Sequence, residues 1–484
     1  MRRHANLTLE GGVLNENRLV CPFHGACFDV RTGDIEDGPC TEHVSHYDVD
    51  ECSDGTVQIH IPSTTGKRLE NSRLPEFVQQ DTKDKRRFVI IGGGPASMSA
   101  VETLRGREVG FTGRITLISR EEHPFYYRIK TSKALAIDVT KSPFTSSRPT
   151  ARYTERLYKQ LGVQMLLGHE VERLDAEGKN IRLRKTGDTS GKTSVSIQYD
   201  KVLCATGGPA RTFRPSLRAT ERFSIDGADM NGIYVIRYAG DNAAMMRGIE
   251  QAKRARGSGR VRVVVIGASF IGMEVASALA TEFGVQEPRE SESEDEGVDE
   301  AGASKSNKLQ QLCVVDMSPC ALGPMGEQVG MIMQDRAEAK HVSFRLQHKM
   351  LRFEPSADSD DQVGFVVVTP PDSDEEEHIP ADVVVIGAGM VPVTDYVEGN
   401  DGIRTGLRET RGGIAVDSHM HAGMDVYAAG DIAAFPLSRA GDESSGDAVL
   451  TRVEHWNVAT DLGRVAASNM AGRETTYSGV PFFW

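Results

Sequence analysis

Residues 87–104 read Arg87-Phe-Val-Ile-Ile-Gly92-Gly-Gly94-Pro-Ala-Ser97-Met-Ser-Ala-Val-Glu-Thr-Leu104. The run from Phe88 to Ile91 is apolar without alternation, which is typical of a buried parallel strand, and the residues after it are apolar at helical spacing. Glycine at 92 permits a tight turn, and glycine at 94 lets the backbone approach a pyrophosphate bound at the helix N-terminus. The residues that would open this helix are Pro95, Ala96 and Ser97. The stretch therefore predicts a dinucleotide site, with an ordinary strand-to-helix turn as the alternative.

The same pattern returns in Arg260-Val-Arg-Val-Val-Val-Ile-Gly267-Ala-Ser269-Phe-Ile-Gly272-Met-Glu274. Ser269 stands where the middle glycine is expected, and Gly272 holds the third small position. Two dinucleotides need two phosphate turns, so the repeat is stronger evidence than either copy alone. The chain is expected to hold two dinucleotides.

An acidic residue follows the next strand of each unit, where a carboxylate accepts hydrogen bonds from ribose hydroxyls. Glu121 ends the apolar strand that starts at Arg114, with a solvated charge as the alternative, and Asp316 ends the strand that starts at Leu312. Gly272 and Asp316 are 20 residues apart once the 24-residue acidic insertion 285–308 is left out. Asp316 repels a 2′-phosphate, and no Arg or Lys lies between 316 and 327, so NADH is favoured over NADPH.

Composition narrows the classes of protein that fit. The chain has 484 residues, 39% hydrophobic and 26% charged, with a net charge of −13. This charge argues against nucleic acid or an anionic membrane as the main partner. Seven cysteines, an odd number and thinly spread, indicate a reducing compartment. No apolar run is long enough to span a membrane. We expect a cytoplasmic protein, with a mitochondrial one as the alternative, and the sequence leaves a homodimer open.

The N-terminal string Cys21-Pro-Phe-His24-Gly-Ala-Cys27-Phe-Asp29 resembles the second ligand loop of a Rieske [2Fe–2S] domain. In such domains two loops each supply one cysteine and one histidine, so the resemblance implies Cys21 and His24 as metal ligands. Arg2 stands where the first loop would carry its cysteine, so we expect the chain to begin inside that loop and to offer half of the ligand set. Two alternatives stay open. One is a zinc site that adds Cys40 and His43, and the other is a Rieske-like domain without metal.

Further motifs make the resemblance more specific. Arg128 and Lys133 are five residues apart after the first unit, and Lys201-Val-Leu-Cys-Ala-Thr-Gly207-Gly208 resembles the turn that ends a first flavin segment. The chain resembles the pyridine-nucleotide-disulfide-reductase-like flavoproteins, most closely the apoptosis-inducing-factor-like NADH:ferredoxin reductases with an N-terminal Rieske domain. The resemblance implies that Arg128 and Lys133 contact FAD and that Glu274 faces the nicotinamide. No CxxxxC follows the first helix, so a disulfide-reducing site is unsupported.

The C-terminal third carries the remaining flavin motifs. Asp425-Val-Tyr-Ala-Ala-Gly430-Asp431 resembles a second FAD fingerprint, in which Asp431 accepts from a ribityl hydroxyl. The segment beside the flavin ring would hold Glu454, His455 and Trp456, with a plain helix start as the alternative. The strand at 381–386 and its glycine turn, which includes Gly389, are interpreted as the return crossing into the flavin domain. Relatives continue beyond Trp484 into an interface domain, so we expect the chain to stop inside it.

Together these motifs predict an α/β fold with two interleaved, doubly wound Rossmann-like FAD and NAD domains after a partial Rieske β domain. The predicted parts are 1–62 (Rieske), 63–86 (linker), 87–250 (FAD, first part), 251–380 (NAD), 381–465 (FAD, second part) and 466–484 (start of the interface domain). The expected reaction carries electrons from NADH through FAD to a [2Fe–2S] cluster or a ferredoxin-like acceptor protein, with no side chain acting as acid, base or nucleophile. The rival interpretation is a flavoprotein that acts mainly by binding a partner.

Overall fold

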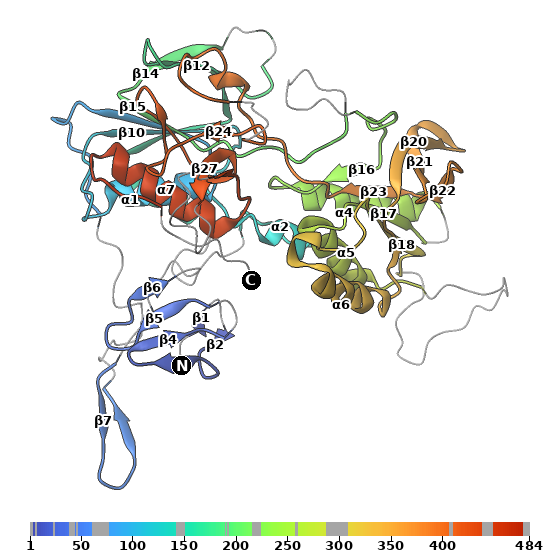
Figure 1. The fold of residues 1–484 in the computed structure, drawn as a ribbon, viewed down its shortest axis with the longest axis horizontal. Coiled ribbons are helices and arrows are strands. Elements are labelled where there is room, and N and C mark those ends of the chain that lie inside the picture. Colours follow the sequence, from blue (N-terminus) through green and yellow to red (C-terminus); the bar gives the residue numbers. More distant parts are fainter. Residues whose placement is uncertain are drawn as a thin grey trace. The chain divides into compact units, whose positions relative to one another are not determined.

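The computed structural model of the chain is shown in Figure 1. It describes residues 3–4, 7–22, 25–37, 44, 47–60, 77–141, 151–188, 190, 193–214, 224–256, 260–286, 308–405, 410–437 and 449–477. The chain divides into two compact units, and the second is inserted into the first. The first unit comprises Met1–Tyr126, Pro143–Thr206 and Tyr396–Trp484, and the second comprises Tyr127–Ser142 and Gly207–Asp395.

The N-terminal part of the first unit is built from short antiparallel strands. Four of them pair in the order β3-β4-β5-β6, with bounds Val13–Asn15, Arg18–Val20, Cys27–Asp29 and Ile35–Asp37. Two further pairs are β1 (Arg3–His4) with β2 (Leu7–Thr8), and β7 (Val49–Glu51) with β8 (Val57–Ile59). A small apolar core of Cys21, Ala26 and Phe28 supports the loop that precedes β5.

The main sheet of the first unit has the order β11-β10-β9-β15-β26-β25, and only β25 is antiparallel to its neighbour. Its strands are β9 (Arg87–Ile91), β10 (Arg114–Ser119), β11 (Val163–Leu167), β15 (Lys201–Cys204), β25 (His421–Gly423) and β26 (Val426–Ala428). The apolar run after Arg87 is thus the central strand that the sequence predicts, and it is buried on both faces as parallel strands usually are.

Helices and smaller sheets complete the first unit. Helix α1 (Pro95–Arg105) packs on α7 (Trp456–Met470), where a Cβ on Gly463 would lie 2.3 Å from the carbonyl oxygen of Ala96. Helix α3 spans Ala151–Gln160. The antiparallel strands are β12 (His169–Asp175), β13 (Asn180–Lys185) and β14 (Val195–Gln198). Near the C-terminus lie η3 (Asp395–Val397), η4 (Gly430–Ile432), β24 (Ile414–Ala415), β27 (Ala433–Leu437) and β28 (Val449–Thr451).

The second unit repeats this plan with a five-stranded parallel sheet of order β16-β23-β17-β18-β19. Its strands are Ile233–Val235, Val383–Ile386, Arg262–Ile266, Gln311–Val315 and Ser343–Arg345 in that order. Its helices are α2 (Lys130–Lys133), α4 (Asp241–Ala255), α5 (Phe270–Phe283), η2 (Gly323–Met325) and α6 (Glu327–Glu338). An antiparallel sheet of β20 (Lys349–Ser356), β21 (Ser359–Thr369) and β22 (Glu377–Pro380) follows.

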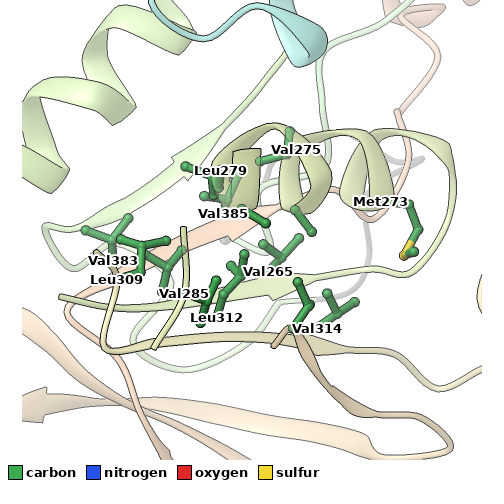
Figure 2. Packing of buried hydrophobic residues seen from close by; sticks show 14 of the residues in the cluster. Val265, Met273, Val275, Leu279, Val285, Leu309, Leu312, Val314, Val383 and Val385 are labelled. Atoms are coloured by element: carbon green, nitrogen blue, oxygen red, sulfur yellow. The ribbon is translucent and has the colours of Figure 1, made fainter. Parts of the chain in front are cut away.

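The core beneath α5 is shown in Figure 2, where Val275 and Leu279 lie over the strands that carry Val265 and Val385. All four side chains are fully buried. Burial of an aliphatic side chain of this size stabilises the fold by roughly 1.5–3 kcal/mol. This core holds the N-terminus of α5 at the carboxyl end of β17, where the second glycine turn lies.

Both central strands begin with the same clamp. The Arg87 backbone and guanidinium donate to Asp200 at 2.6 and 3.1 Å, and Arg262 donates in the same way to Asp382 at 2.8 and 2.7 Å. Burial alone would raise the pKa of Asp200, but its hydrogen bonds to Arg87 outweigh that effect and the pKa is lowered. The clamp at Arg87 therefore keeps the Asp200 carboxylate ionised at the amino end of its sheet.

The acidic insertion leaves and re-enters the second unit at one place. The Leu309 N–H donates to the carbonyl of Gly284 at 3.0 Å, and the Gln286 N–H donates to the carbonyl of Leu309 at 3.0 Å. Val285 and Leu309 form a parallel bridge and are both buried. The two ends of the insertion are thus fixed to each other, while residues 287–307 lie outside the described part of the chain.

The α/β prediction is confirmed, but three segments group differently from the predicted parts. The strand at 383–386 pairs with β16 and β17, so the predicted return crossing at residue 381 is wrong and the chain leaves the second unit at Asp395. Residues 207–250 and 127–142, predicted with the FAD domain, also group with the second unit. Among the described residues, no helix is both long enough and apolar enough to cross a membrane.

Candidate functional site

The first glycine turn connects β9 to α1. Gly92 has φ +127°, and a Cβ there would lie 2.1 Å from the carbonyl oxygen of Ala205, so the turn itself requires glycine. Gly94 precedes α1, and a Cβ there would meet no atom of the described chain. The space beside Gly94 is open, which is compatible with the approach of a pyrophosphate.

Ser97 gives independent support for this cradle. Its side chain is 1% exposed, and its Oγ makes no hydrogen bond within the described residues. An unsatisfied buried hydroxyl normally costs about 1–3 kcal/mol, so a partner outside the chain is expected. Pro95 and Ala96 occupy the first two positions of α1. The residues of this turn fit the pyrophosphate of FAD, although their contact with it stays a prediction.

Glu121 lies beyond the end of β10, as predicted for a ribose acceptor. The Tyr126 hydroxyl, which is itself buried, donates to Glu121 Oε2 at 2.6 Å. This bond orients the carboxylate and was not foreseen from the sequence. A tyrosine five residues after the acid was the only available signal.

The second glycine turn connects β17 to α5. Gly267 has φ +107°, and a Cβ on Gly272 would lie 1.8 Å from the carbonyl oxygen of Gly267. Ser269 has φ −86° and is exposed, so serine fits where the fingerprint has a glycine. The first turn of α5 is open to solvent, since Phe270 and Ile271 are 37% and 38% exposed. An exposed helix N-terminus behind a glycine turn fits the pyrophosphate of NAD.

Asp316 follows β18 and lies beside this turn. Its Oδ2 accepts from the Ala268 N–H at 2.6 Å, and its Oδ1 accepts from the Ser318 N–H at 2.6 Å. Two backbone donors thus hold the carboxylate in one orientation. This is the arrangement that recognition of a ribose hydroxyl needs, because the acceptor is positioned before the ligand arrives.

Glu274, on the second turn of α5, binds two side chains of α2. It accepts a hydrogen bond from Ser132 at one oxygen and forms an ion pair with Lys133 at the other. Burial and the charge of Glu274 both raise the pKa of Tyr127. The family resemblance implies that Glu274 faces the nicotinamide and that Lys133 contacts FAD, but the sequence carries no signal for their pairing or for Ser132.

Arg128, the other predicted FAD contact, also has partners inside the second unit. Its guanidinium donates to the carbonyl of Arg237 at 2.5 Å and lies 5.6 Å from the ring centre of Tyr238. The segment that carries Arg128 and Lys133 is therefore held by the second unit. Whether either side chain contacts FAD stays a prediction.

The remaining flavin candidates lie in the first unit. Arg452 donates to the carbonyl of Asp431 at 2.8 Å and pairs with Glu454 at 2.8 Å. His455 immediately precedes α7, and burial lowers its pKa despite the opposing charge of Asp431. Trp456 opens α7, with its ring centre 5.4 Å from that of Phe125. Gly430 has φ +77° and lies against Ala96 of the first turn.

Gly389 is expected in the flavin domain, but the structure places it in the second unit. It lies in the second unit with φ +86°, and its carbonyl accepts from the Arg211 N–H at 3.0 Å. The glycine that abuts a dinucleotide turn is Gly387, because a Cβ there would lie 2.8 Å from the Gly272 nitrogen. Sequence reasoning missed Gly387, since either glycine suits a turn after an apolar strand.

The predicted metal site is only partly covered by the structure. Cys21 is 1% exposed and lies in an apolar cluster, whereas His24, Cys40 and His43 fall outside the described residues. No group of three or more His, Cys, Asp or Glu side chains able to hold a metal occurs in the described ranges. One thiol is a quarter of the ligand set of a Rieske cluster, so we derive no reaction step through a cluster.

Two sequence families account for nearly the whole chain. Residues 86–463 match the pyridine nucleotide-disulphide oxidoreductases, and residues 3–48 match the Rieske [2Fe-2S] domain. The chain belongs to the pyridine nucleotide-disulphide oxidoreductase family and carries a Rieske domain at its N-terminus. It is therefore an oxidoreductase of the flavin- and nicotinamide-dependent class, which confirms the resemblance inferred from the motifs.

Three named proteins show what this chain is similar to. The chain is 27% identical over 489 residues to apoptosis-inducing factor 3 of Homo sapiens, covering 99% of this chain and 67% of that protein. It is 25% identical over 398 residues to rhodocoxin reductase of Rhodococcus erythropolis, covering 82% and 75%. In structure it resembles a ferredoxin reductase of Rhodopseudomonas palustris with a TM-score of 0.61, 23% identity, and coverage of 83% and 80%. This last likeness shows the fold alone.

Proposed function

We infer that the protein is an NADH-dependent reductase that passes electrons through FAD to a ferredoxin-like one-electron acceptor. The observation that most supports this inference is the pair of glycine turns at Gly92 and Gly267. Each turn precedes a helix in its own unit. The names of relatives such as rhodocoxin reductase support the same reaction. When bound, FAD accepts two electrons together as hydride and releases them one at a time.

The chain's own residues bind and orient the two cofactors. The Gly92 turn with Ser97 would hold the FAD pyrophosphate, and Glu121, oriented by Tyr126, would accept from its ribose. In the second unit the Gly267 turn would hold the NADH pyrophosphate, and Asp316 its adenosine ribose. In this proposal no side chain needs to transfer a proton. The protein's contribution is to position the reactants.

Anaerobic stopped-flow mixing with NADH tests this proposal. The oxidised flavin absorbance should disappear within seconds. A ferredoxin-like acceptor added next should restore it in single-electron steps. Flavin that stays oxidised for minutes would instead favour the partner-binding flavoprotein, which the likeness to apoptosis-inducing factor 3 keeps as the second candidate.

Asp316→Asn should weaken the binding of NADH and allow NADPH to bind better. An amide has one acceptor oxygen, so it cannot satisfy both the Ala268 and the Ser318 N–H groups, and it no longer repels a 2′-phosphate. We expect the ratio of kcat/KM for NADH over NADPH to fall about tenfold, which is about 1.4 kcal/mol. Steady-state kinetics with both nucleotides measure it. Asp335→Asn, an exposed charge on α6, is the control, and an unchanged ratio in Asp316→Asn would remove Asp316 from ribose recognition.

The ligand set of the N-terminal Rieske domain can be tested directly. The sequence supplies Cys21 and His24 in the second loop, but it has Arg2 two residues before His4, where the first loop needs a cysteine. We expect Arg2→Cys to raise bound iron toward about two atoms per chain with matching acid-labile sulfide, because a Rieske cluster needs two thiolates and two imidazoles. Arg3→Cys is the matched control. Zinc in both proteins, without sulfide, would favour the alternative zinc site.

A further inference from the structure

We propose that Asn242 is a positioning residue for the nicotinamide site, and that it acts by fixing the strap, defined here as residues 127–142, to the second unit. The inference rests on the proposed function, because its consequence is a slower reduction by NADH. All groups involved lie within the second unit.

Asn242 attaches the strap through its side-chain amide. It is the second residue of α4, is 1% exposed, and its Nδ2 donates to the carbonyl oxygens of Ala134, Leu135 and Ile137 at 3.4, 3.1 and 2.8 Å. Only the nitrogen of the amide can face three acceptors, which settles the orientation of the group. The two amide hydrogens thus hold a four-residue stretch of backbone that follows α2 immediately.

An apolar contact reinforces this attachment. Leu135 is buried in the same cluster as Met245 of α4 and Met273 of α5. The strap is therefore held between the two helices by packing and by hydrogen bonds at the same point. Apolar packing fixes how deep the strap lies, whereas directional hydrogen bonds fix its register along α4.

The other end of this attachment is the contact with Glu274. Ser132 and Lys133, the last two residues of α2, bind its two carboxylate oxygens. A displacement of the 134–137 backbone moves both donors together, because they directly precede it in the chain. Asn242 therefore sets where Glu274 and the Lys133 ammonium stand relative to the Gly267 turn, although it contacts neither.

The isosteric variant Asn242→Asp tests the proposal, since it removes both donors and turns a carboxylate toward three carbonyls. Asn242→Ala is the milder second variant, to be used if the first does not fold. We expect hydrogen exchange of the strap amides to accelerate at least about tenfold. The rate of flavin reduction by NADH should also fall about tenfold, because misplacing a reacting group by about 1 Å can cost up to 10²-fold. The NADH concentration at half-maximal rate should change less than about threefold, because Asp316 and the glycine turn are untouched.

Asn469 provides a matched control. Its Nδ2 donates to the carbonyls of His419, Val465 and Thr475 at 3.1, 2.9 and 2.6 Å, in the first unit and at the far end of α7. Asn469→Asp and Asn469→Ala remove the same kind of contact, a side-chain amide that donates to three backbone carbonyls. They should leave strap exchange and flavin reduction within about twofold of the unchanged protein, as expected for sites that share no partners.

Two results would overturn the proposal. One is strap exchange that is unchanged in the Asn242 variants, which would show that the amide does not hold the strap. The other is faster exchange with an unchanged reduction rate, which would show that the strap does not position the site. If the unchanged protein is not reduced by NADH, the proposed function fails instead. Hydrogen exchange still shows whether Asn242 holds the strap.

Discussion

With alanine in place of Gly272, the protein is expected to keep its FAD and to lose its reduction by NADH. The new Cβ would lie 1.8 Å from the carbonyl oxygen of Gly267, which is backbone and cannot rotate away. Overpacking usually costs about 1–3 kcal/mol, and a clash with backbone should reach the upper end of that range. About 3 kcal/mol of lost NADH binding and positioning corresponds to roughly a 100-fold fall in the rate of flavin reduction per unit of NADH concentration.

Flavin content by absorbance and reduction by stopped-flow separate the two parts of this expectation. Gly323→Ala is the matched control, because it lies in the same unit and its added Cβ would meet nothing within 4 Å. Gly272→Ala reduced by NADH at the rate of the control would show that the turn at Gly267 does not hold the nucleotide. Loss of FAD from Gly272→Ala would contradict the assignment of the two cofactors to separate turns.

Gly92→Ala is expected to have the opposite effect, so that the protein is purified without flavin. Its Cβ would lie 2.1 Å from the carbonyl oxygen of Ala205, and alanine would also have to adopt φ +127°. Strain of this kind costs about 1–3 kcal/mol in addition to the overpacking. The turn would have to move away from β15, and the start of α1 would move with it.

The measurements are the ratio of FAD to protein and the binding of NADH to the flavin-free chain by titration calorimetry. Gly110→Ala is the control, because Gly110 also has a positive φ, +64°, but its nearest neighbour is an oxygen at 3.6 Å. It therefore reports strain without the clash. A flavin-loaded Gly92→Ala protein would contradict the role of the first turn. Normal NADH binding by the flavin-free chain would support the separation of the two sites.

The elements of the dinucleotide units could be predicted because local sequence determines them. A continuous apolar strand, a glycine turn and an apolar-periodic helix stand within about 18 residues, so each element can be recognised without knowing its distant partners. The positive φ values of Gly92 and Gly267 follow from the same local pattern. The family assignment, reached from these motifs, is confirmed by the match over residues 86–463.

Pairing between distant segments could not be predicted in the same way. The apolar strand at 383–386 could pair in either parallel sheet, since the central strands β9 and β17 are both rich in Val and Ile, and only the structure shows it beside β17. The resemblance places the strap in the FAD domain, because it implies that Arg128 and Lys133 contact FAD. The contacts that hold the strap in the second unit come instead from Asn242 and Glu274, more than 100 residues away. A short segment whose helix has only four residues carries no periodicity from which such partners could be inferred.

The bridge between Val285 and Leu309 has a practical consequence. The chain leaves and re-enters the second unit at this one hydrogen-bonded bridge, so the length of the insertion has little effect on the rest of the protein. Doubling the length of the insertion costs only about 0.6 kcal/mol in loop-closure entropy. A fluorescent reporter or an affinity tag could be spliced there, between α5 and β18, without moving either glycine turn. The enzyme thus offers an internal attachment point for following it in cells while both of its ends stay as they are.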